Sequence, residues 1–199
     1  MSSAEATKPE LRRAVLGARA SLTEAYLRRA PQALARRASD LPELADARTV
    51  AAYVSVGREP GTGPLLDALR DRGVRVLLPV LLPDDDLDWA EYEGRDGLAP
   101  AARGLLEPQG PRRGPGAVMA ADAVLLPGLA VDGRGVRLGR GGGSYDRVLA
   151  RLESAGRRPA LVVLLYDGEV LERVPSERHD RPVTAAVTPT EVRRFAGRP

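Results

Sequence analysis

The stretch that decides the fold is residues 121–155, ADAVLLPGLAVDGRGVRLGRGGGSYDRVLARLESA. Its first part, Ala121–Val131, is an apolar run that predicts a buried strand with a Pro-Gly break near its end. Its last part, Tyr145–Ala155, has apolar residues at helical spacing and predicts an amphipathic helix. Four of the five residues at 139–143 are glycines, and they form the loop between the two. The stretch therefore predicts a strand, a glycine-rich loop and a helix in succession.

The sequence on either side extends this unit into an α/β domain. Apolar runs predict strands at Thr49–Val56, Val74–Pro79, Leu87–Tyr92, Leu161–Tyr166 and Thr184–Val187. Helical spacing predicts helices at Pro9–Ala20, Thr23–Ser39 and Pro64–Arg72, and abundant Pro and Gly predict a long ordered loop at Gly94–Gly116. A helix between two strands implies that the strands pair in parallel. We see no internal repeat and no linker, so we expect a single domain over residues 1–199.

The composition excludes several classes of protein. The chain has 199 residues, a formal net charge of +3 and no cysteine, which excludes disulfides and zinc–thiolate sites. Basic residues are interspersed with acids and aromatic residues make up only 4%, which argues against a nucleic-acid partner. No apolar run approaches the roughly 20 residues that span a membrane, and the N-terminal sequence lacks the apolar region of a signal peptide. We therefore expect a cytoplasmic protein with no membrane partner.

The glycine-rich loop at 139–143 has the make-up of a phosphate-binding loop. Glycines let backbone N–H groups approach an anion closely, and the N-terminus of the following helix adds a partial positive charge. Arg137 and Arg140 can each donate two hydrogen bonds to phosphate oxygens. The loop is neither a P-loop nor a GxGxxG motif, so a flexible surface turn is the alternative. Asp146, in the first helical turn, is either a magnesium ligand or an acid that complements the helix dipole.

Residues 127–147, PGLAVDGRGVRLGRGGGSYDR, resemble the signature of the 5-formyltetrahydrofolate cyclo-ligase family, also called 5,10-methenyltetrahydrofolate synthetases. Shorter motifs fit the same family in the same order, namely Lys8-Pro-Glu-Leu11-Arg12, Glu59-Pro-Gly-Thr62, Leu106-Glu107-Pro108 and His179-Asp180-Arg-Pro-Val183. The resemblance implies an α/β fold: a single three-layer domain with a mostly parallel sheet flanked by helices. It also implies ATP-dependent cyclisation of 5-formyltetrahydrofolate to 5,10-methenyltetrahydrofolate, with release of ADP and phosphate.

The resemblance further implies a set of site residues. ATP, as co-substrate, would be bound by Lys8, Arg12, Arg137, Gly139, Arg140, Gly141, Gly142, Gly143 and Tyr145. Mg²⁺ would be held, directly or through water, by Asp146 and Asp180. Val54 and Glu59 would face the folate, where a carboxylate can accept hydrogen bonds from the donor edge of the pterin. Arg140 and Tyr145 would act in catalysis, and we expect the enzyme to be a monomer.

Each of these assignments has a structural alternative. Lys8 and Arg12 could form a solvated helix face, Val54 could be a core residue, and Glu59 could be an ordinary loop acid. His179, the only histidine, is interpreted as orienting its loop rather than as a base, because nothing near it in sequence completes a catalytic pair.

The chain departs from the family pattern at a few positions. Ser144 stands where the family often has a first tyrosine, Val131 where it often has an aromatic residue, and Glu169 where a glutamine is usual. None of these removes a phosphate or metal group. The main alternative function is a non-folate phosphate-ligand binding or regulatory protein of similar fold, and a nucleic-acid accessory protein is a further one. Glu59 discriminates against the first, because a phosphate binder needs no acid for a pterin.

Overall fold

The computed structural model describes residues 6–177 and 180–195, so the prediction for His179 lies outside the described residues. The helices are α1 (Lys8–Ala20), α2 (Glu24–Ser39), α3 (Pro42–Ala45), α4 (Gly63–Asp71) and α5 (Ser144–Ser154), with 3-10 turns η1 (Arg95–Gly97), η2 (Ala102–Gly104) and η3 (Pro115–Ala120). The strands are β1 (Thr49–Ala51), β2 (Arg75–Leu81), β3 (Leu87–Glu91), β4 (Leu98–Pro100), β5 (Leu106–Pro108), β6 (Ala123–Pro127), β7 (Ala130–Asp132), β8 (Arg137–Leu138), β9 (Ala160–Leu164), β10 (Val170–Leu171), β11 (Ala185–Val187) and β12 (Val192–Arg194).

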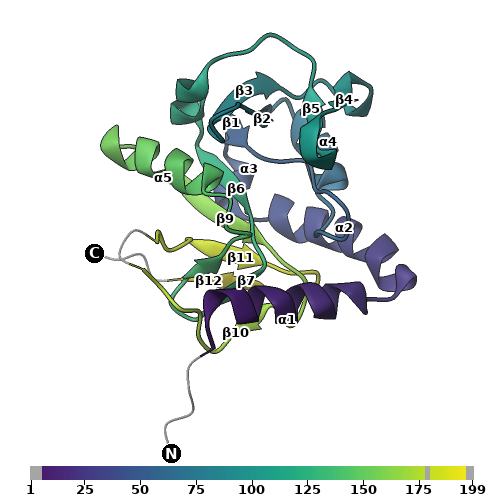
Figure 1. Cartoon of the computed structure of the whole chain (residues 1–199). Helices are drawn as coiled ribbons and strands as arrows, with labels where there is room; N and C mark the ends of the chain where they lie inside the picture. Colours follow the sequence, from purple (N-terminus) through teal and green to yellow (C-terminus); the bar gives the residue numbers. More distant parts are fainter. Residues whose placement is uncertain (1–5, 178–179, 196–199) are drawn as a thin grey trace, which may run out of the picture.

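The central sheet has the strand order β12-β11-β9-β6-β1-β2-β3 (Figure 1). Its inner pairs are parallel, and antiparallel pairing occurs at the two edges, with β12 on one side and β3 on the other. Smaller sheets hold β10-β7-β8 and the β4-β5 hairpin. The predicted α/β fold, with a mostly parallel sheet flanked by helices, is confirmed.

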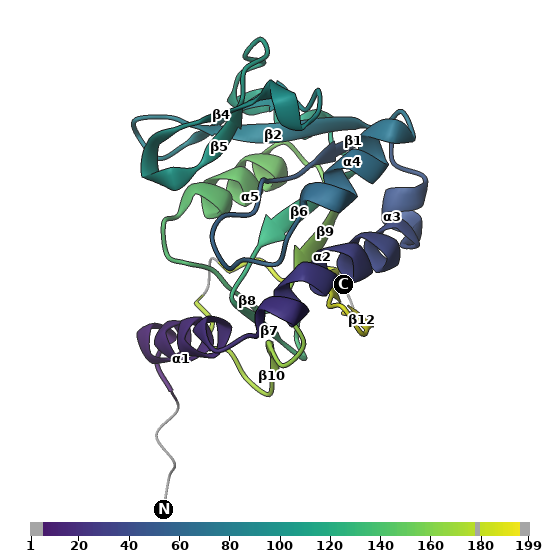
Figure 2. The same cartoon turned by 90° about the vertical axis from the view of Figure 1, so that its right-hand side faces the viewer.

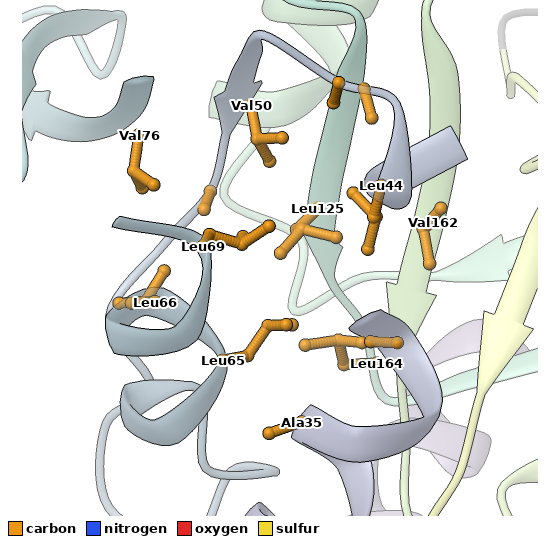
Figure 3. Packing of buried hydrophobic residues seen from close by; sticks show 14 of the residues in the cluster. Ala35, Leu44, Val50, Leu65, Leu66, Leu69, Val76, Leu125, Val162 and Leu164 are labelled. Atoms are coloured by element: carbon orange, nitrogen blue, oxygen red, sulfur yellow. The ribbon is translucent and has the colours of Figure 1, made fainter. Parts of the chain in front are cut away.

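Alternation along the strands gives the sheet two apolar faces. On one face, Val50, Leu125 and Val162 pack against helices α2, α3 and α4 (Figure 3). On the other face, Ala51, Val124 and Val163 pack against α5 and η3. Fully burying one such leucine or valine contributes about 1.5–3 kcal/mol. The sheet therefore forms the middle of three layers.

Helix α1 lies apart from these layers and packs on the small sheet. Its Val15 is buried with Leu129, Val136 and Leu138 of the β7–β8 region. Thr7 begins the helix with a capping box, because its hydroxyl accepts from the Glu10 N–H and the Glu10 carboxylate accepts from the Thr7 N–H at 2.8 Å. This cap places Lys8 in the first helical turn.

Three predicted segments differ from the structure. The first strand was predicted to run to Val56 but ends at Ala51, because side chains take over its backbone bonds: the Ser55 N–H donates to Thr62 and the Val56 N–H to Glu59. The strand predicted at Ala121–Val131 divides at Pro127-Gly128 into β6 and β7, which belong to different sheets. The loop predicted at Gly94–Gly116 contains the β4–β5 hairpin.

The strand order reverses beside β1. The chain goes from β1 to β2 on one side and then returns to β6 on the other side of β1. In open parallel sheets, such a reversal leaves a crevice at the carboxyl ends of the two diverging strands, where ligands bind. The carboxyl ends of β1 and β6 lead into Tyr53–Val54 and Gly128, which line a cavity.

Candidate active site

The cavity at this reversal has a volume of about 750 Å³. Segments far apart in sequence line it: the start of α1, the residues after β1, the end of β6, the glycine-rich loop with the start of α5, and the β4–β5 hairpin. Figure 2 shows α1, α5 and the hairpin on the same side of the molecule. The cavity is of a size that accommodates drug-sized ligands.

The glycine-rich loop forms one wall of the cavity and leads into α5. Gly141 and Gly143 have φ of +97° and +76°, values that favour glycine, and Gly143 is the cap of α5. A β-carbon added at Gly142 would meet no atom within 4 Å. Arg12 donates from Nε to the Gly139 carbonyl at 2.9 Å, so α1 holds the loop in place. The loop thus presents open backbone at a helix N-terminus, which suits an anion.

The cations around the loop are paired with acids that line the same cavity. Lys8 Nζ lies 2.9 Å from both Glu177 Oε1 and Asp180 Oδ2. Although partial burial lowers the pKa of Lys8, these hydrogen bonds outweigh it and the net pKa lies above its ordinary value. Arg140 Nε lies 3.0 Å from Glu59 Oε1.

Arg137 is the deeply buried cation of the site. It donates from Nη1 to the Pro127 carbonyl at 2.9 Å and from Nη2 to Asp146 Oδ1 at 3.2 Å. Burial lowers its pKa from the ordinary arginine value, yet the group stays charged at neutral pH. Its Nε has no hydrogen-bond partner within the part of the chain that the structure describes. A buried cation with a spare donor suits an anionic ligand.

Tyr145 also offers a polar atom to a ligand. Its hydroxyl oxygen is buried and makes no hydrogen bond to any residue in 6–177 or 180–195. Burial raises the pKa of Tyr145 above the ordinary tyrosine value, so the hydroxyl keeps its proton at neutral pH. Tyr145 can therefore donate a hydrogen bond to a ligand, but it does not act as a base.

The predicted folate residues lie in the opposite wall. The Glu59 side chain is 9% exposed, and its Oε2 accepts from the Val56 N–H at 2.9 Å. Val54 lines the cavity, as do apolar side chains of the β2–β3 and β4–β5 hairpins: Leu81, Leu87, Leu105 and Leu106. Glu107, also part of this wall, accepts from the Leu81 N–H at 2.9 Å and so joins the two hairpins. This end of the cavity is largely apolar and carries two carboxylates, Glu59 and Glu107, each held by a backbone N–H.

Asp146, just after the glycine-rich loop, and Asp180 also line the cavity. No group of three or more His, Asp or Glu side chains among residues 6–177 and 180–195 is arranged to hold a metal. Mg²⁺ needs no such cluster, because it usually takes one or two carboxylates and fills its shell with water and phosphate oxygens. Asp146 is 49% exposed, which leaves its carboxylate accessible. The two acids are thus chemically suited to Mg²⁺.

The structure brings the whole predicted set to one cavity. All the predicted ATP, folate, metal and catalytic residues are among its lining residues. Sequence reasoning missed Tyr53, Arg103 and Glu177, which also line it, because their positions carry no local signal. It also missed the buried partner of Glu169, which is Arg19, 150 residues away in sequence.

The comparisons with known proteins agree on one family. The chain matches the 5-formyltetrahydrofolate cyclo-ligase family over residues 4–189. It is 41% identical over 189 residues to the 5-formyltetrahydrofolate cyclo-ligase of Mycolicibacterium smegmatis, covering 92% of this chain and 94% of the relative. It is 34% identical over 176 residues to the enzyme of that name from Escherichia coli, covering 87% and 96% respectively.

Solved structures agree as well. The NMR structure of 5,10-methenyltetrahydrofolate synthetase from Aquifex aeolicus superposes with a TM-score of 0.80 at 32% identity, covering 96% of this chain and 95% of the other. The synthetase from Mycoplasma pneumoniae, at 19% identity and a TM-score of 0.69, covers 90% and 96% and supports the fold alone. No helix in the described parts of the chain is long and apolar enough to cross a membrane.

Proposed function

This chain belongs to the 5-formyltetrahydrofolate cyclo-ligase family, and from that premise we infer how its cavity divides between two substrates. The enzyme converts 5-formyltetrahydrofolate to 5,10-methenyltetrahydrofolate at the expense of ATP. ATP occupies the wall built by the glycine-rich loop, and the folate occupies the apolar wall with Glu59. The observation that carries this division is the open backbone at Gly142 and Gly143, at the N-terminus of α5 and inside the cavity.

On the nucleotide side, the loop N–H groups and Arg137 bind the triphosphate, and Gly139–Gly143 wrap it. The spare Nε donor of Arg137 supports this role, because a buried unpaired donor is costly unless a ligand satisfies it. Lys8 and Arg12 reach the phosphates from α1, whose first two turns border the cavity. Three hydrogen-bonding cations and a helix N-terminus can neutralise a triphosphate.

On the folate side, the Glu59 carboxylate accepts hydrogen bonds from the donor edge of the pterin. Its burial supports this role, because a hydrogen bond to a shielded carboxylate is stronger than one in water. Val54 and the leucines of the two hairpins pack against the flat ring system. The carboxylate fixes the orientation of the pterin, and the apolar wall provides the surface on which the ring system is buried.

The chemistry asks mainly for positioning and charge neutralisation. The formyl oxygen attacks the γ-phosphoryl group and ADP leaves. N10 then attacks the phosphorylated carbon, phosphate leaves, and the proton of N10 goes to the departing phosphate. Arg140 lies at the boundary of the two halves, since it pairs with Glu59 at 3.0 Å, and there it stabilises charge on the transferred phosphoryl group. Tyr145 donates its buried hydroxyl proton as a hydrogen bond to the reacting oxygens.

Mg²⁺ is held beside the phosphates by Asp146 and Asp180. When bound, it neutralises phosphate charge. Both acids are now paired with phosphate-side cations, Asp146 with Arg137 and Asp180 with Lys8. On binding of Mg–ATP, Lys8 and Arg137 would pair with the phosphates, and Asp146 and Asp180 would then be available to hold the metal. We further propose that the enzyme acts as a cytoplasmic monomer without nucleic-acid or membrane partners, in line with its mixed surface charge.

The function is tested with the purified protein and 5-formyltetrahydrofolate. Absorbance of methenyltetrahydrofolate is followed with ATP and Mg²⁺, with ATP and a chelator, and without ATP. Product is expected only in the first reaction. A folded protein that forms no product under saturating ATP and Mg²⁺ contradicts the proposal. Binding of ATP without binding of folate instead supports the phosphate-ligand alternative.

A further inference from the structure

A buried ion pair lies behind the folate wall, and the reaction described above does not use it. Arg19, at the end of α1, is 3% exposed, and Glu169, before β10, is 6% exposed. Arg19 Nε donates to Glu169 Oε1 at 2.7 Å, and Nη2 donates to Oε2 at 2.9 Å. Burial lowers the pKa of Arg19, but its hydrogen bond and charge interaction with Glu169 outweigh that and leave a net increase. The guanidinium and the carboxyl group are thus fixed in a two-bond geometry.

The ion pair holds one aromatic residue, Tyr166. Glu169 Oε2 accepts a hydrogen bond from the Tyr166 N–H at 2.9 Å. The Arg19 guanidinium lies over the Tyr166 ring, 5.6 Å from its centre. The backbone and the ring of Tyr166 are therefore both fixed by the pair.

Tyr166 in turn holds Glu59, the residue proposed to bind the folate. Its hydroxyl donates to the Glu59 carbonyl at 2.9 Å. The preceding residue is held from the other side, because Arg58 Nε donates to the Arg19 carbonyl at 3.0 Å. The Glu59 carbonyl and the Arg58 side chain are thus both anchored to the same network. Since the Glu59 side chain starts from this backbone, its carboxylate position depends on these bonds.

The same ion pair also contacts the segment that follows β6, on the other side of the crevice. Arg19 Nη2 donates to the Gly128 carbonyl at 2.8 Å, and Gly128 lines the cavity just after β6. Both cavity-lining segments at the strand-order reversal are therefore tied to Arg19. A buried pair is worth little net stability against an apolar substitute, but it fixes one geometry, which a binding site needs.

We propose that Tyr166, held by the Arg19–Glu169 ion pair, is a positioning residue that fixes Glu59 for the folate ring. The inference rests on the proposed function, in that Glu59 is taken to contact the folate. Tyr166 touches no substrate; it acts through the Glu59 backbone. Its contribution belongs to folate recognition and not to nucleotide recognition.

Tyr166→Phe tests this role with Tyr26→Phe as the matched control. The two rings contact each other, with centres 5.5 Å apart. Each variant removes one hydroxyl, but Tyr26 donates its proton to Asp167 Oδ2 at 2.8 Å and, within the described residues, makes no hydrogen bond to Glu59. Tyr166→Phe is expected to raise the KM for 5-formyltetrahydrofolate about three- to tenfold, the effect of weakening one neutral hydrogen bond. The KM for ATP and kcat should stay within about twofold of wild type.

Tyr26→Phe is expected to leave all three constants near wild type, even where it lowers the melting temperature as much as Tyr166→Phe does. In a Glu59→Gln background, Tyr166→Phe should add little further increase in the folate KM, because both act through one carboxylate. A raised folate KM in Glu59→Gln with a normal one in Tyr166→Phe overturns this inference alone. A normal folate KM in Glu59→Gln overturns the folate role of Glu59 and this inference together. If the folate KM rises equally in Tyr166→Phe and Tyr26→Phe, the effect is a loss of packing, and the inference is overturned as well.

Discussion

At the scale of single residues, a substitution at Asp146 distinguishes its two possible roles, a metal ligand or an acid that complements the helix dipole. Asp146 lies in the first turn of α5, lines the cavity and accepts from Arg137 at 3.2 Å. Asp146→Asn keeps the size of the side chain and an oxygen that can accept from Arg137, so it should cost about 1 kcal/mol of stability from the dipole and from the charge of this half-exposed acid. The metal, however, would lose an anionic ligand, and kcat should fall on the order of a hundredfold. Turnover and melting temperature are measured on one preparation.

Glu24→Gln is the matched control for Asp146. Glu24 is an acid in the first turn of α2 that pairs with an arginine, Arg58, also at 3.2 Å, but it lies outside the cavity. It should lose a similar small stability and no turnover. Raised Mg²⁺ should restore part of the loss in Asp146→Asn. Near-normal turnover of Asp146→Asn at limiting Mg²⁺ would exclude a metal role.

Single residues also show where sequence reasoning stops. Lys8, Glu59 and Asp180 could be predicted as site residues because each lies in a recognisable short motif. Their pairing could not, because Lys8 and Asp180 are 172 residues apart and only the folded chain brings them together. The sequence showed Glu169 only as a departure from a usual glutamine. The structure explains the acid by its ion pair with Arg19, which is 150 residues away in sequence.

At the scale of elements, the glycine-rich loop offers one position where a side chain tests phosphate binding alone. Gly141 and Gly143 need a left-handed φ, so substitution there strains the backbone whatever the ligand. Gly142 has neither a left-handed φ nor a neighbour that an added β-carbon would meet. A valine there should leave the fold intact but occupy the space of a phosphate. Nucleotide affinity, measured by titration calorimetry, should fall at least about tenfold.

Gly133→Val is the control for the loop. Gly133 lies in the β7–β8 turn, also outside the left-handed region and with no atom within 4 Å of an added β-carbon, but away from the cavity. It should bind nucleotide normally. Unchanged affinity in Gly142→Val would mean that the loop is only a turn, which is the alternative its sequence left open.

The β7–β8 turn that leads into this loop depends on one buried acid. Asp132 is fully buried and accepts from the N–H groups of Arg134, Val136 and Val174 at 2.9–3.1 Å and from the Arg134 guanidinium. Burial raises its pKa, but these hydrogen bonds outweigh it, and the net pKa lies below the ordinary aspartate value. A depressed folded-state pKa contributes stability above the unfolded-state value, about 3.9, and loses it as pH falls through the folded-state value.

Asp132→Asn should therefore lower the free energy of unfolding by about 1–3 kcal/mol at pH 7. The difference from wild type should shrink as pH falls below about 4, because wild type loses the same charge there. Urea unfolding at a series of pH values measures this. A difference that stays constant down to the acid transition would mean that the charge of Asp132 does not stabilise the turn.

Periodicity predicted the long elements well but not the short ones. The helices and the inner strands of the βαβ unit were found because apolar spacing reports on burial over many residues. The split at Pro127-Gly128 was visible as a break, but not that β7 joins another sheet. Gly128 shows the reason: an added β-carbon would lie 2.6 Å from Val163 Cγ2, a contact between strands that local sequence does not reveal.

At the scale of the whole molecule, the strand-order reversal beside β1 brings the proposed nucleotide and folate halves of the cavity together. The segment after β1 carries Glu59, and the chain after β6 leads through β7 and β8 to the glycine-rich loop. The family resemblance could supply the residues of both halves, but not how they meet. In the structure Arg140, proposed for the phosphates, pairs at 3.0 Å with Glu59, proposed for the folate.

This ion pair predicts that nucleotide and folate bind cooperatively. A triphosphate that draws Arg140 to itself frees the Glu59 carboxylate, which is 9% exposed and then needs the donors of the pterin. A non-hydrolysable ATP analogue with Mg²⁺ should therefore raise the affinity for 5-formyltetrahydrofolate about five- to tenfold, and the folate should raise the affinity for the analogue by the same factor. Both are measured by titration calorimetry.

Arg140→Met distinguishes this coupling from the simple loss of a binding residue. Loss of the coupling pair should raise the affinity for folate, whereas loss of a residue that binds folate should lower it. Without the competing cation, folate should bind more tightly to the nucleotide-free variant than to wild type, and the analogue should no longer change its affinity. Arg103→Met is the control: Arg103 also lines the cavity, but it pairs with Asp85 at 2.8 Å, so the coupling should persist. If the analogue leaves folate affinity unchanged in wild type, or raises it equally in Arg140→Met, the ion pair does not couple the sites. Cooperativity carried by Arg140 would mean that each ligand prepares the site of the other, because phosphates that take Arg140 free Glu59, and a pterin that takes Glu59 frees Arg140.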